Sequence, residues 1–149
     1  MSAGEYCNRD VVVVDKTESV REVIKLMRKH HVGDVVVVEK KNNKTFPIGI
    51  FTDRDIVIEI LAEDVDLNAI NVGDVMSFEL VSVSEDSKLL DAIKLMRIKG
   101  VRRLVVVNDK KELSGILTVD DVLELLSEQL SDIVALVSKE ITNEVNLRV

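Results

Sequence analysis

The chain has 149 residues, of which 46% are hydrophobic and 32% are charged, and this composition is typical of a globular protein. Its formal net charge of −7 argues against specific nucleic-acid binding, because binding a polyanion depends on a surface rich in Lys and Arg. The single cysteine, Cys7, excludes an internal disulfide framework and a cysteine-based zinc site. We find no signal peptide and no apolar run long enough to span a bilayer, so we expect a cytoplasmic protein without membrane contact.

The first half of the chain is predicted to alternate short strands and helices. Ser19 and Glu22 have the spacing of a capping box, which predicts a helix start, and the basic run Arg28–His31 suits the helix end. A polar loop is expected at Glu39–Thr45. Strands are expected at Asp10–Asp15, Val35–Val38 and Ile48–Phe51, with helices from Ser19 to about His31 and from Thr52 to about Ala62.

The second half repeats this order. Strands are expected at Leu80–Val83, Leu104–Val107 and Leu113–Leu117, with helices at about Ser87–Lys99 and from Thr118 onward. A segment at Glu63–Ser77 joins the halves and is expected to contain a short helical turn.

The residues repeat as well as the elements. Ile24–Arg28 recurs unchanged as Ile93–Arg97, 69 residues later, and the motif Thr-x-x-Asp recurs at a distance of 66 residues. The difference fits an insertion near Lys41–Phe46 in the first copy. The sequence therefore predicts an α/β fold of two pseudo-symmetric β-α-β-β-α halves that fold against each other, because each half alone would bury too little apolar surface.

The last predicted helix continues well beyond its counterpart in the first half. Apolar residues recur along it from Val122 to Ile141 as a wide stripe. Two interpretations stay open: the helix packs on its own domain, or the stripe is a face for self-association.

Each Thr-x-x-Asp stands where a strand turns into a helix. Thr52 and Thr118 are good N-cap residues, and Asp55 and Asp121 suit the first helical turn, so the motif can be helix-start chemistry alone. A glycine lies three residues before each Thr, where backbone or ligand can approach closely. Free amides and the helix dipole at such a turn attract phosphate, and an acid there can bind a ribose diol. The motif thus also fits a nucleoside-phosphate pocket.

The duplicated order, the repeated helix and the turn Gly-h-h-Thr-x-x-Asp (h, apolar) resemble a tandem pair of cystathionine-β-synthase (CBS) domains. The resemblance implies CBS motifs at residues 8–62 and 74–128, a linker at 63–73 and a C-terminal helical extension at 129–149. It also implies clefts that bind adenosyl ligands such as AMP, ADP, ATP or S-adenosylmethionine, and a disc-like homodimer that signals to a regulated partner protein. Because the resemblance covers nearly the whole of this sequence, we expect no attached catalytic domain.

The resemblance assigns roles to particular residues. Asp55 and Asp121 match ribose-binding acids, and Thr52 and Thr118 match hydroxyls that hold phosphate or ribose. Arg102 and Arg103 are candidates for holding a phosphate in a cleft that the sequence does not identify, or else form a solvated basic pair at a helix end. The adenine slot would be lined by Val12, Val32, Val81 and Val101, each of which could instead be ordinary core.

The two copies differ in charge next to the motif. Arg54 is placed to meet phosphate with its forked donors, whereas its counterpart Asp120 would repel phosphate. We therefore expect the Thr52 site to take a charged nucleotide and the Thr118 site a less charged ligand or none.

An enzyme has little support in this sequence. His30 and His31 are adjacent, so their side chains diverge on a helix and do not share a metal. No nucleophile motif and no phosphate-binding loop ending in Gly-Lys-Thr/Ser is present. The competing hypothesis is a ligand-independent dimerisation and protein-interaction module whose pockets are vestigial.

Overall fold

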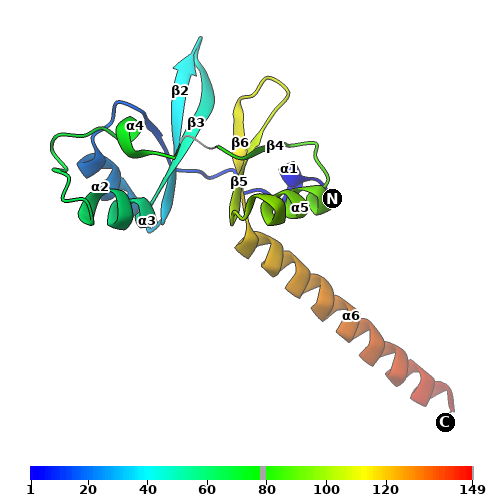
Figure 1. Cartoon of the computed structure of the whole chain (residues 1–149). Coiled ribbons are helices and arrows are strands. Elements are labelled where there is room, and N and C mark those ends of the chain that lie inside the picture. Colours follow the sequence, from blue (N-terminus) through cyan, green and yellow to red (C-terminus); the bar gives the residue numbers. More distant parts are fainter. Residues whose placement is uncertain (78–79, 149) are drawn as a thin grey trace.

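In the computed structural model, which describes residues 1–77 and 80–148, the chain forms two similar halves side by side, and a long helix projects from the second (Figure 1). Each half contains a three-stranded sheet in which the first strand pairs parallel, and the third antiparallel, with the middle strand. The strands are β1 (Val13–Asp15), β2 (Asp34–Lys41) and β3 (Lys44–Thr52) in the first half, and β4 (Ser82–Ser84), β5 (Arg103–Val107) and β6 (Leu113–Thr118) in the second. This arrangement confirms the predicted α/β fold and its pseudo-symmetry.

The helices also recur in pairs. The first half contains α2 (Val20–His30), α3 (Asp53–Asp55) continuing as the π-helical segment η1 (Ile56–Leu61), and α4 (Val72–Val75); the others are α1 (Ala3–Tyr6), α5 (Leu89–Lys99) and α6 (Val119–Arg148). Ser19 caps α2 as predicted, because its hydroxyl oxygen accepts from the Glu22 amide at 3.2 Å. The Glu22 carboxylate instead accepts from Lys25 at 3.1 Å. The short α4 is the helical turn expected between the halves, whereas α1 has no counterpart among the predicted elements.

The predicted loop at Glu39–Thr45 is wrong. Strands β2 and β3 continue through it as a hairpin, and Lys41 pairs with Lys44. Asn42 and Asn43 form the turn with φ of 52° and 61°, the left-handed conformations that a two-residue hairpin turn of type I′ requires. Asparagine tolerates this region better than most residues, so the Asn-Asn pair was the available signal.

The apolar runs in β2 and β5 are buried on both faces. Val35 and Val37 pack into the core of the first half, while Val36 and Val38 face the other way. There they meet Val105 and other residues of the second half in a shared core. Because both faces of β2 are covered, the strand is continuously apolar and does not alternate. The expectation that the halves fold against each other is confirmed.

The two single-turn helices are exchanged between the halves. Helix α1 precedes β1 in sequence but its Ala3 packs in the core of the second half, whereas Val72 of α4 packs in the core of the first. The chain after each helix then crosses β3 or β6: the Ser77 amide donates to Ile50 O at 3.0 Å, and the Asn8 amide donates to Ile116 O at 2.8 Å. The boundaries predicted for the two motifs, 8–62 and 74–128, do not describe this exchange and stay a prediction.

These crossings explain the glycine before each Thr-x-x-Asp. A Cβ on Gly49 would lie 2.8 Å from Ser77 O, and one on Gly115 would lie 2.6 Å from Asn8 O. The close approach is therefore made by the chain itself. Cys7 packs at the second crossing, and burial raises the pKa of its thiol, so the group stays protonated at neutral pH, as a packing residue does.

Substituting Gly115 tests this packing. We expect Gly115→Ala to lower the free energy of unfolding by about 3 kcal/mol, since the new methyl group meets a backbone oxygen that cannot rotate away. Gly100→Ala is the matched control: the space there is open and only its φ of +65° opposes a side chain, so the loss should be about 1 kcal/mol. Urea unfolding of both variants measures the difference. Equal losses in the free energy of unfolding would contradict the close packing of the chain at Asn8 over Gly115.

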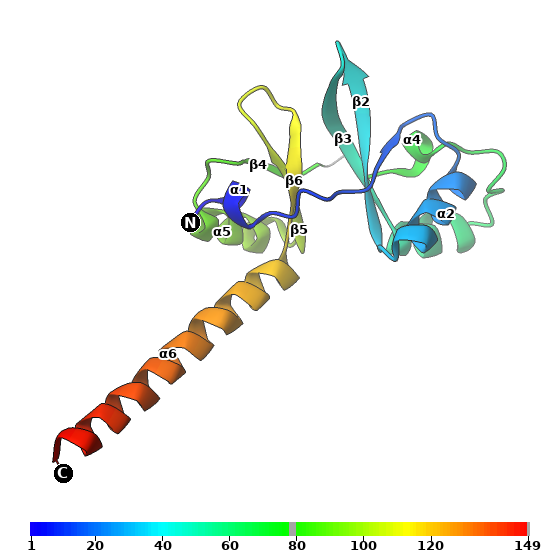
Figure 2. The same cartoon turned by 180° about the vertical axis from the view of Figure 1, so that it is seen from behind.

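The exposure of the apolar stripe on α6 bears on the two interpretations left open by the sequence, packing on its own domain or a face for self-association. Val122 is buried against the second half, but Leu126 and the apolar residues beyond it are half or more exposed. Seen from behind in Figure 2, the helix runs clear of both halves. Packing along its own domain is therefore wrong for most of α6. Among the residues that the structure describes, no helix has the length and apolarity needed to cross a membrane. Residue 149 of the predicted extension lies outside the described residues.

Candidate functional site

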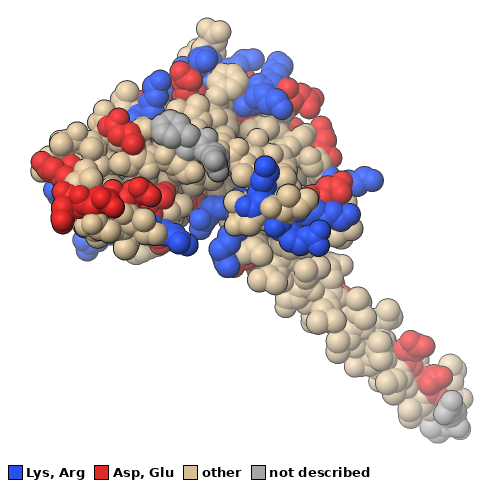
Figure 3. All heavy atoms as spheres, in the orientation of Figure 1, with Lys and Arg blue, Asp and Glu red and all other residues tan. Residues whose placement is uncertain are grey.

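A cleft of about 340 Å³ lies between the two halves and collects most of the predicted site residues. The turn after β3 contributes Thr52, Arg54 and Asp55 to its lining. The second half contributes Val81, Val101, Arg102 and Arg103. We call this the Thr52 cleft. In Figure 3 the molecule is indented between the two halves, with Lys and Arg side chains near the indentation.

The turn at Thr52 is a complete capping box. The Thr52 amide donates to Asp55 Oδ2 at 2.9 Å, and the Asp55 amide donates back to Thr52 Oγ1 at 3.2 Å. This satisfies two amides that the helix start would otherwise leave without a partner. The helix-start function of the motif is thus realised, while the second carboxylate oxygen of Asp55 and the hydroxyl proton of Thr52 are not used by the box.

The expectation of free amides at this turn is wrong. The Asp53 amide donates to Gly33 O at 2.9 Å, and the Arg54 amide donates to Asp53 Oδ1 at 2.8 Å. Together with the capping box, these bonds occupy every backbone N–H from Thr52 to Asp55. An anion in this cleft would therefore have to be held by side chains.

The turn at Thr118 has the same geometry. Thr118 and Asp121 exchange two hydrogen bonds of 3.2 Å, and the Val119 amide donates to Arg102 O at 2.8 Å, as the Asp53 amide does to Gly33. The scaffold of the duplicated motif is conserved between the halves in three dimensions, and only the neighbouring side chains differ.

Arg103 joins the two halves. Its Nε lies 3.1 Å from Asp34 Oδ2, and both side chains are partly buried. Asp34 occupies in the first half the position that Arg103 occupies in the second, so the pair spans the pseudo-twofold axis. Arg103 Nε is buried without good hydrogen-bond geometry to any described residue, so this contact is an ion pair alone.

Arg102 is held more loosely. Its Nη2 lies 3.7 Å from Asp120 Oδ1, and both side chains are largely exposed, at 74% and 82%. An exposed pair at this distance contributes little to stability, so a competing anion can displace Asp120. Arg102 and Arg103 both line the Thr52 cleft, and Arg102 also lines a second cavity of about 300 Å³ beside Val119 and Val122.

The lining of the Thr52 cleft carries opposing charges. Arg54, Arg102 and Arg103 contribute three positive charges, and Asp53 and Asp55 contribute two negative charges. Two of these arginines are already paired with carboxylates outside this count, Arg102 with Asp120 and Arg103 with Asp34, so an anionic ligand would compete with those carboxylates for them.

Four predicted residues lie elsewhere. Val12 and Val32 line a separate cavity of about 320 Å³ beside Leu26 and His30. Thr118 and Asp121 form the corresponding turn of the second half and do not line the Thr52 cleft.

The sequence analysis missed other residues of the cleft lining: Ile50, Asp53, Ser77 and Gly100. Ile50 could have been found, because it precedes Thr52 by two residues on a strand and so shares its face. Ser77 and Gly100 are placed by the crossing and by the left-handed end of α5, which no local pattern indicates. Within the described residues, no cluster of three His, Cys, Asp or Glu side chains is arranged to hold a metal ion.

Comparisons with known proteins agree with this architecture. The family model for the CBS domain matches twice, at residues 3–62 and 72–128. Protein MK0525 of Methanopyrus kandleri is 39% identical over 125 residues, which is 84% of this chain but 62% of that protein. The CBS domain-containing protein YhcV of Bacillus subtilis is 38% identical over 120 residues, 80% of this chain and 81% of YhcV.

A solved structure shows the same fold. The CBS domain protein PAE2072 of Pyrobaculum aerophilum, in complex with AMP, has a TM-score of 0.73 and 28% sequence identity, covering 85% of this chain and 99% of that one. Two tandem matches, the paired sheets and these relatives lead to one conclusion: this chain belongs to the CBS-domain family.

Proposed function

We propose that this chain is a regulatory module that binds an adenosine nucleotide in the Thr52 cleft. The observation that carries the proposal is the convergence of Asp55, Arg54, Arg102 and Arg103 on one cleft between the halves. The AMP complex of PAE2072, a protein of the same fold, supports the choice of ligand.

Each part of a nucleotide has a suitable group in the cleft. Apolar side chains of Ile50, Val81 and Val101 would contact the adenine ring. The carboxylate oxygen of Asp55 that the capping box does not use would accept from the ribose diol. The guanidinium groups of Arg54 and Arg102 would hold the phosphate through charge-assisted hydrogen bonds.

Binding in this cleft would act on the contact between the halves. Arg103 is already paired with Asp34 across the pseudo-twofold axis, and Arg102 contacts Asp120 at the start of α6. A phosphate that recruits these arginines weakens one or both contacts. Ligand occupancy would thus change the relative placement of the halves and of α6, which a regulated partner protein could recognise.

The competing proposal is an interaction module whose pockets are vestigial. Asp120 beside the Thr118 turn supports it for the second copy, because it opposes an anion there. Exposed apolar side chains on η1 and α6, including Val57 and Leu61, support self-association as a homodimer under either proposal.

A thermal-shift measurement separates the two proposals. AMP at 1 mM is expected to raise the melting temperature by several degrees, since a ligand that binds only the folded state stabilises it. Adenosine and S-adenosylmethionine in parallel samples test the contributions of the phosphate and of the adenosyl group. If AMP, ADP, ATP and S-adenosylmethionine all leave the melting temperature unchanged at millimolar concentration, the nucleotide proposal fails and the interaction module remains.

A further inference from the structure

The three arginines that line the Thr52 cleft are not equally available to a ligand. Within the part of the chain that the structure describes, the Arg54 guanidinium has no hydrogen bond or ion pair. Arg102 contacts the exposed Asp120 at 3.7 Å. Arg103 contacts Asp34 at 3.1 Å, where the two side chains are only 33% and 22% exposed. Availability to an anion therefore falls from Arg54 to Arg102 to Arg103.

The two carboxylates that pair with these arginines stand where the other copy of the duplicated sequence has arginine. Asp34 occupies in the first half the position of Arg103 in the second, and Asp120 occupies in the second half the position of Arg54 in the first. Asp34 also pairs with Thr52 in the β2–β3 ladder, so it lies at the edge of the cleft. The charge difference between the copies therefore supplies the Thr52 cleft with its counter-ions.

Neither ion pair is arranged to give the fold much stability. Arg102 and Asp120 are largely exposed, and such pairs contribute little to the free energy of unfolding. Arg103 Nε is buried and makes no hydrogen bond to any described residue, which is unfavourable for a buried donor. The effect of both pairs on the cleft is larger, because each neutralises an arginine that a phosphate would otherwise meet.

The carboxylates leave the cleft without a surplus of positive charge. The two aspartates of its lining, together with Asp34 and Asp120, make four described carboxylates against three guanidinium groups. A single phosphate group has about two negative charges at neutral pH. It can be held by Arg54, together with an Arg102 that has moved away from Asp120. A monophosphate thus needs only the two more available arginines.

Each further phosphate group requires a further cation. The third arginine of the cleft is Arg103, and drawing it away from Asp34 would leave a partly buried carboxylate without its partner, which is costly. We propose that Asp34 and Asp120 make the Thr52 cleft selective for a nucleoside monophosphate over a diphosphate or triphosphate. Each carboxylate acts through the arginine that it holds. The inference rests on the proposed nucleotide site and adds the class of nucleotide that it accepts.

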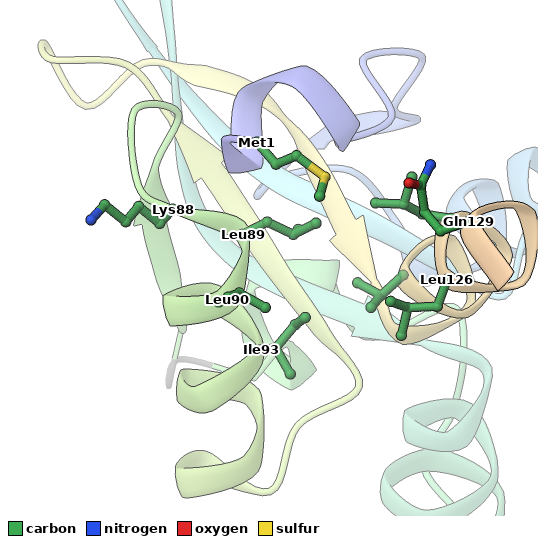
Figure 4. Close-up of a pocket in the computed structure, with 9 residues that line it drawn as sticks. Met1, Lys88, Leu89, Leu90, Ile93, Leu126 and Gln129 are labelled. Atoms are coloured by element: carbon green, nitrogen blue, oxygen red, sulfur yellow. The ribbon is translucent and has the colours of Figure 1, made fainter. Parts of the chain in front are cut away.

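The cavities next to the cleft do not suit the end of a longer phosphate chain. The cavity of about 300 Å³ beside Val119 contains Arg97 in addition to the shared arginine, but its other side chains are apolar, and Asp120 follows Val119 in the chain. Aliphatic side chains such as Leu126 line the groove of about 380 Å³ between α5 and α6, and Figure 4 shows the Lys88 amine pointing away from it. A phosphate group would lose its hydration in these cavities with little compensation.

Titration calorimetry of the full chain with adenosine, AMP, ADP and ATP, in a buffer with EDTA and no divalent cation, tests the selectivity. In the unchanged chain we expect AMP to bind at least about 10-fold more tightly than ATP. Asp34→Asn releases Arg103, so it should raise ATP affinity at least about 10-fold, AMP affinity less than about threefold and adenosine affinity less than about twofold. Asp120→Asn releases Arg102, which AMP also uses, so AMP affinity should rise about threefold and ATP affinity about 10-fold.

Asp132→Asn is the matched control. It removes the same charge from an exposed position of α6, twelve residues beyond Asp120 and about 18 Å along the helix. Charges so far apart are screened at physiological ionic strength, so each affinity should change less than about twofold.

Two outcomes would overturn the selectivity while leaving the nucleotide site in place. One is ATP that binds the unchanged chain as tightly as AMP. The other is an Asp34→Asn variant in which adenosine affinity changes as much as ATP affinity, since that would show a structural role only. Asp120 is largely exposed, so Asp120→Asn keeps the test decisive if Asp34→Asn does not fold. If none of the four ligands binds the unchanged chain, the nucleotide site itself fails, and the selectivity fails with it.

Discussion

Replacing Asp55 with alanine is expected to weaken AMP binding about 10- to 100-fold. The carboxylate faces the Thr52 cleft, and its loss removes acceptors for the ribose diol, worth about 1–3 kcal/mol. The same substitution removes half of a capping box and should lower the free energy of unfolding by about 1 kcal/mol. Titration calorimetry with AMP, at a temperature where the variant is folded, measures the first effect, and urea unfolding measures the second.

The duplication supplies the matched control. Asp121→Ala removes the equivalent carboxylate from an equivalent capping box, so its cost in stability should be similar. Asp121 does not line the Thr52 cleft, and AMP affinity should therefore change less than twofold. If the two variants bind AMP equally well, Asp55 is a helix cap only and the assignment of the ribose site fails.

Reversing the charge of Arg54 is expected to be the most damaging single change to nucleotide binding. Arg54 is exposed at the cleft, where a phosphate would accept its forked donors. Arg54→Glu loses charge-assisted hydrogen bonds of about 3 kcal/mol and adds repulsion, so AMP affinity should fall at least 100-fold. Adenosine, which has no phosphate, should bind the variant within about threefold of its affinity for the unchanged chain.

A control separates this local effect from the change in net charge. Lys29→Glu makes the same charge reversal at the exposed end of α2, away from the cleft lining. It should alter AMP affinity less than threefold at physiological ionic strength, where distant surface charges are screened. Parallel loss of AMP and adenosine binding in Arg54→Glu would show that Arg54 maintains the shape of the cleft and does not contact phosphate.

Much of the fold follows from local patterns in the sequence. The β-branched runs around Val36 and Val105 predict buried strands, and Ser19 predicts the start of α2. The repeat then fixes the order of elements in both halves. Helix α1 escaped prediction because a single turn such as Ala3–Tyr6 carries too few residues for a periodic signal, and the half against which it packs is set by tertiary contacts.

The types of residue at the site were predictable from the sequence, but the way in which distant segments bring them together was less so. Thr52, Arg54 and Asp55 belong to one turn, so their proximity follows from sequence. Arg102 and Arg103 reach the same cleft only because the two halves meet along β2 and β5, and no local pattern encodes that geometry. The Asp53 amide likewise donates to Gly33 O, a hydrogen bond between distant segments that the motif does not reveal.

The two copies of Thr-x-x-Asp differ in the charges beside them, and we therefore expect them to differ in the ligand that they bind. Both turns have the same capping hydrogen bonds, but Arg54 is replaced by Asp120 in the second, and Arg54, Arg102 and Arg103 together line the Thr52 cleft. Because the turn is repeated but the charges beside it are not, we expect each chain to bind one charged nucleotide.

Equilibrium binding of AMP to the full chain, followed to saturation by calorimetry with the protein concentration fixed by amino-acid analysis, tests this claim directly. We predict one AMP per chain, and loss of that site in Arg54→Glu. Two equivalent AMP molecules per chain, or saturable binding that survives Arg54→Glu unchanged, would contradict the account.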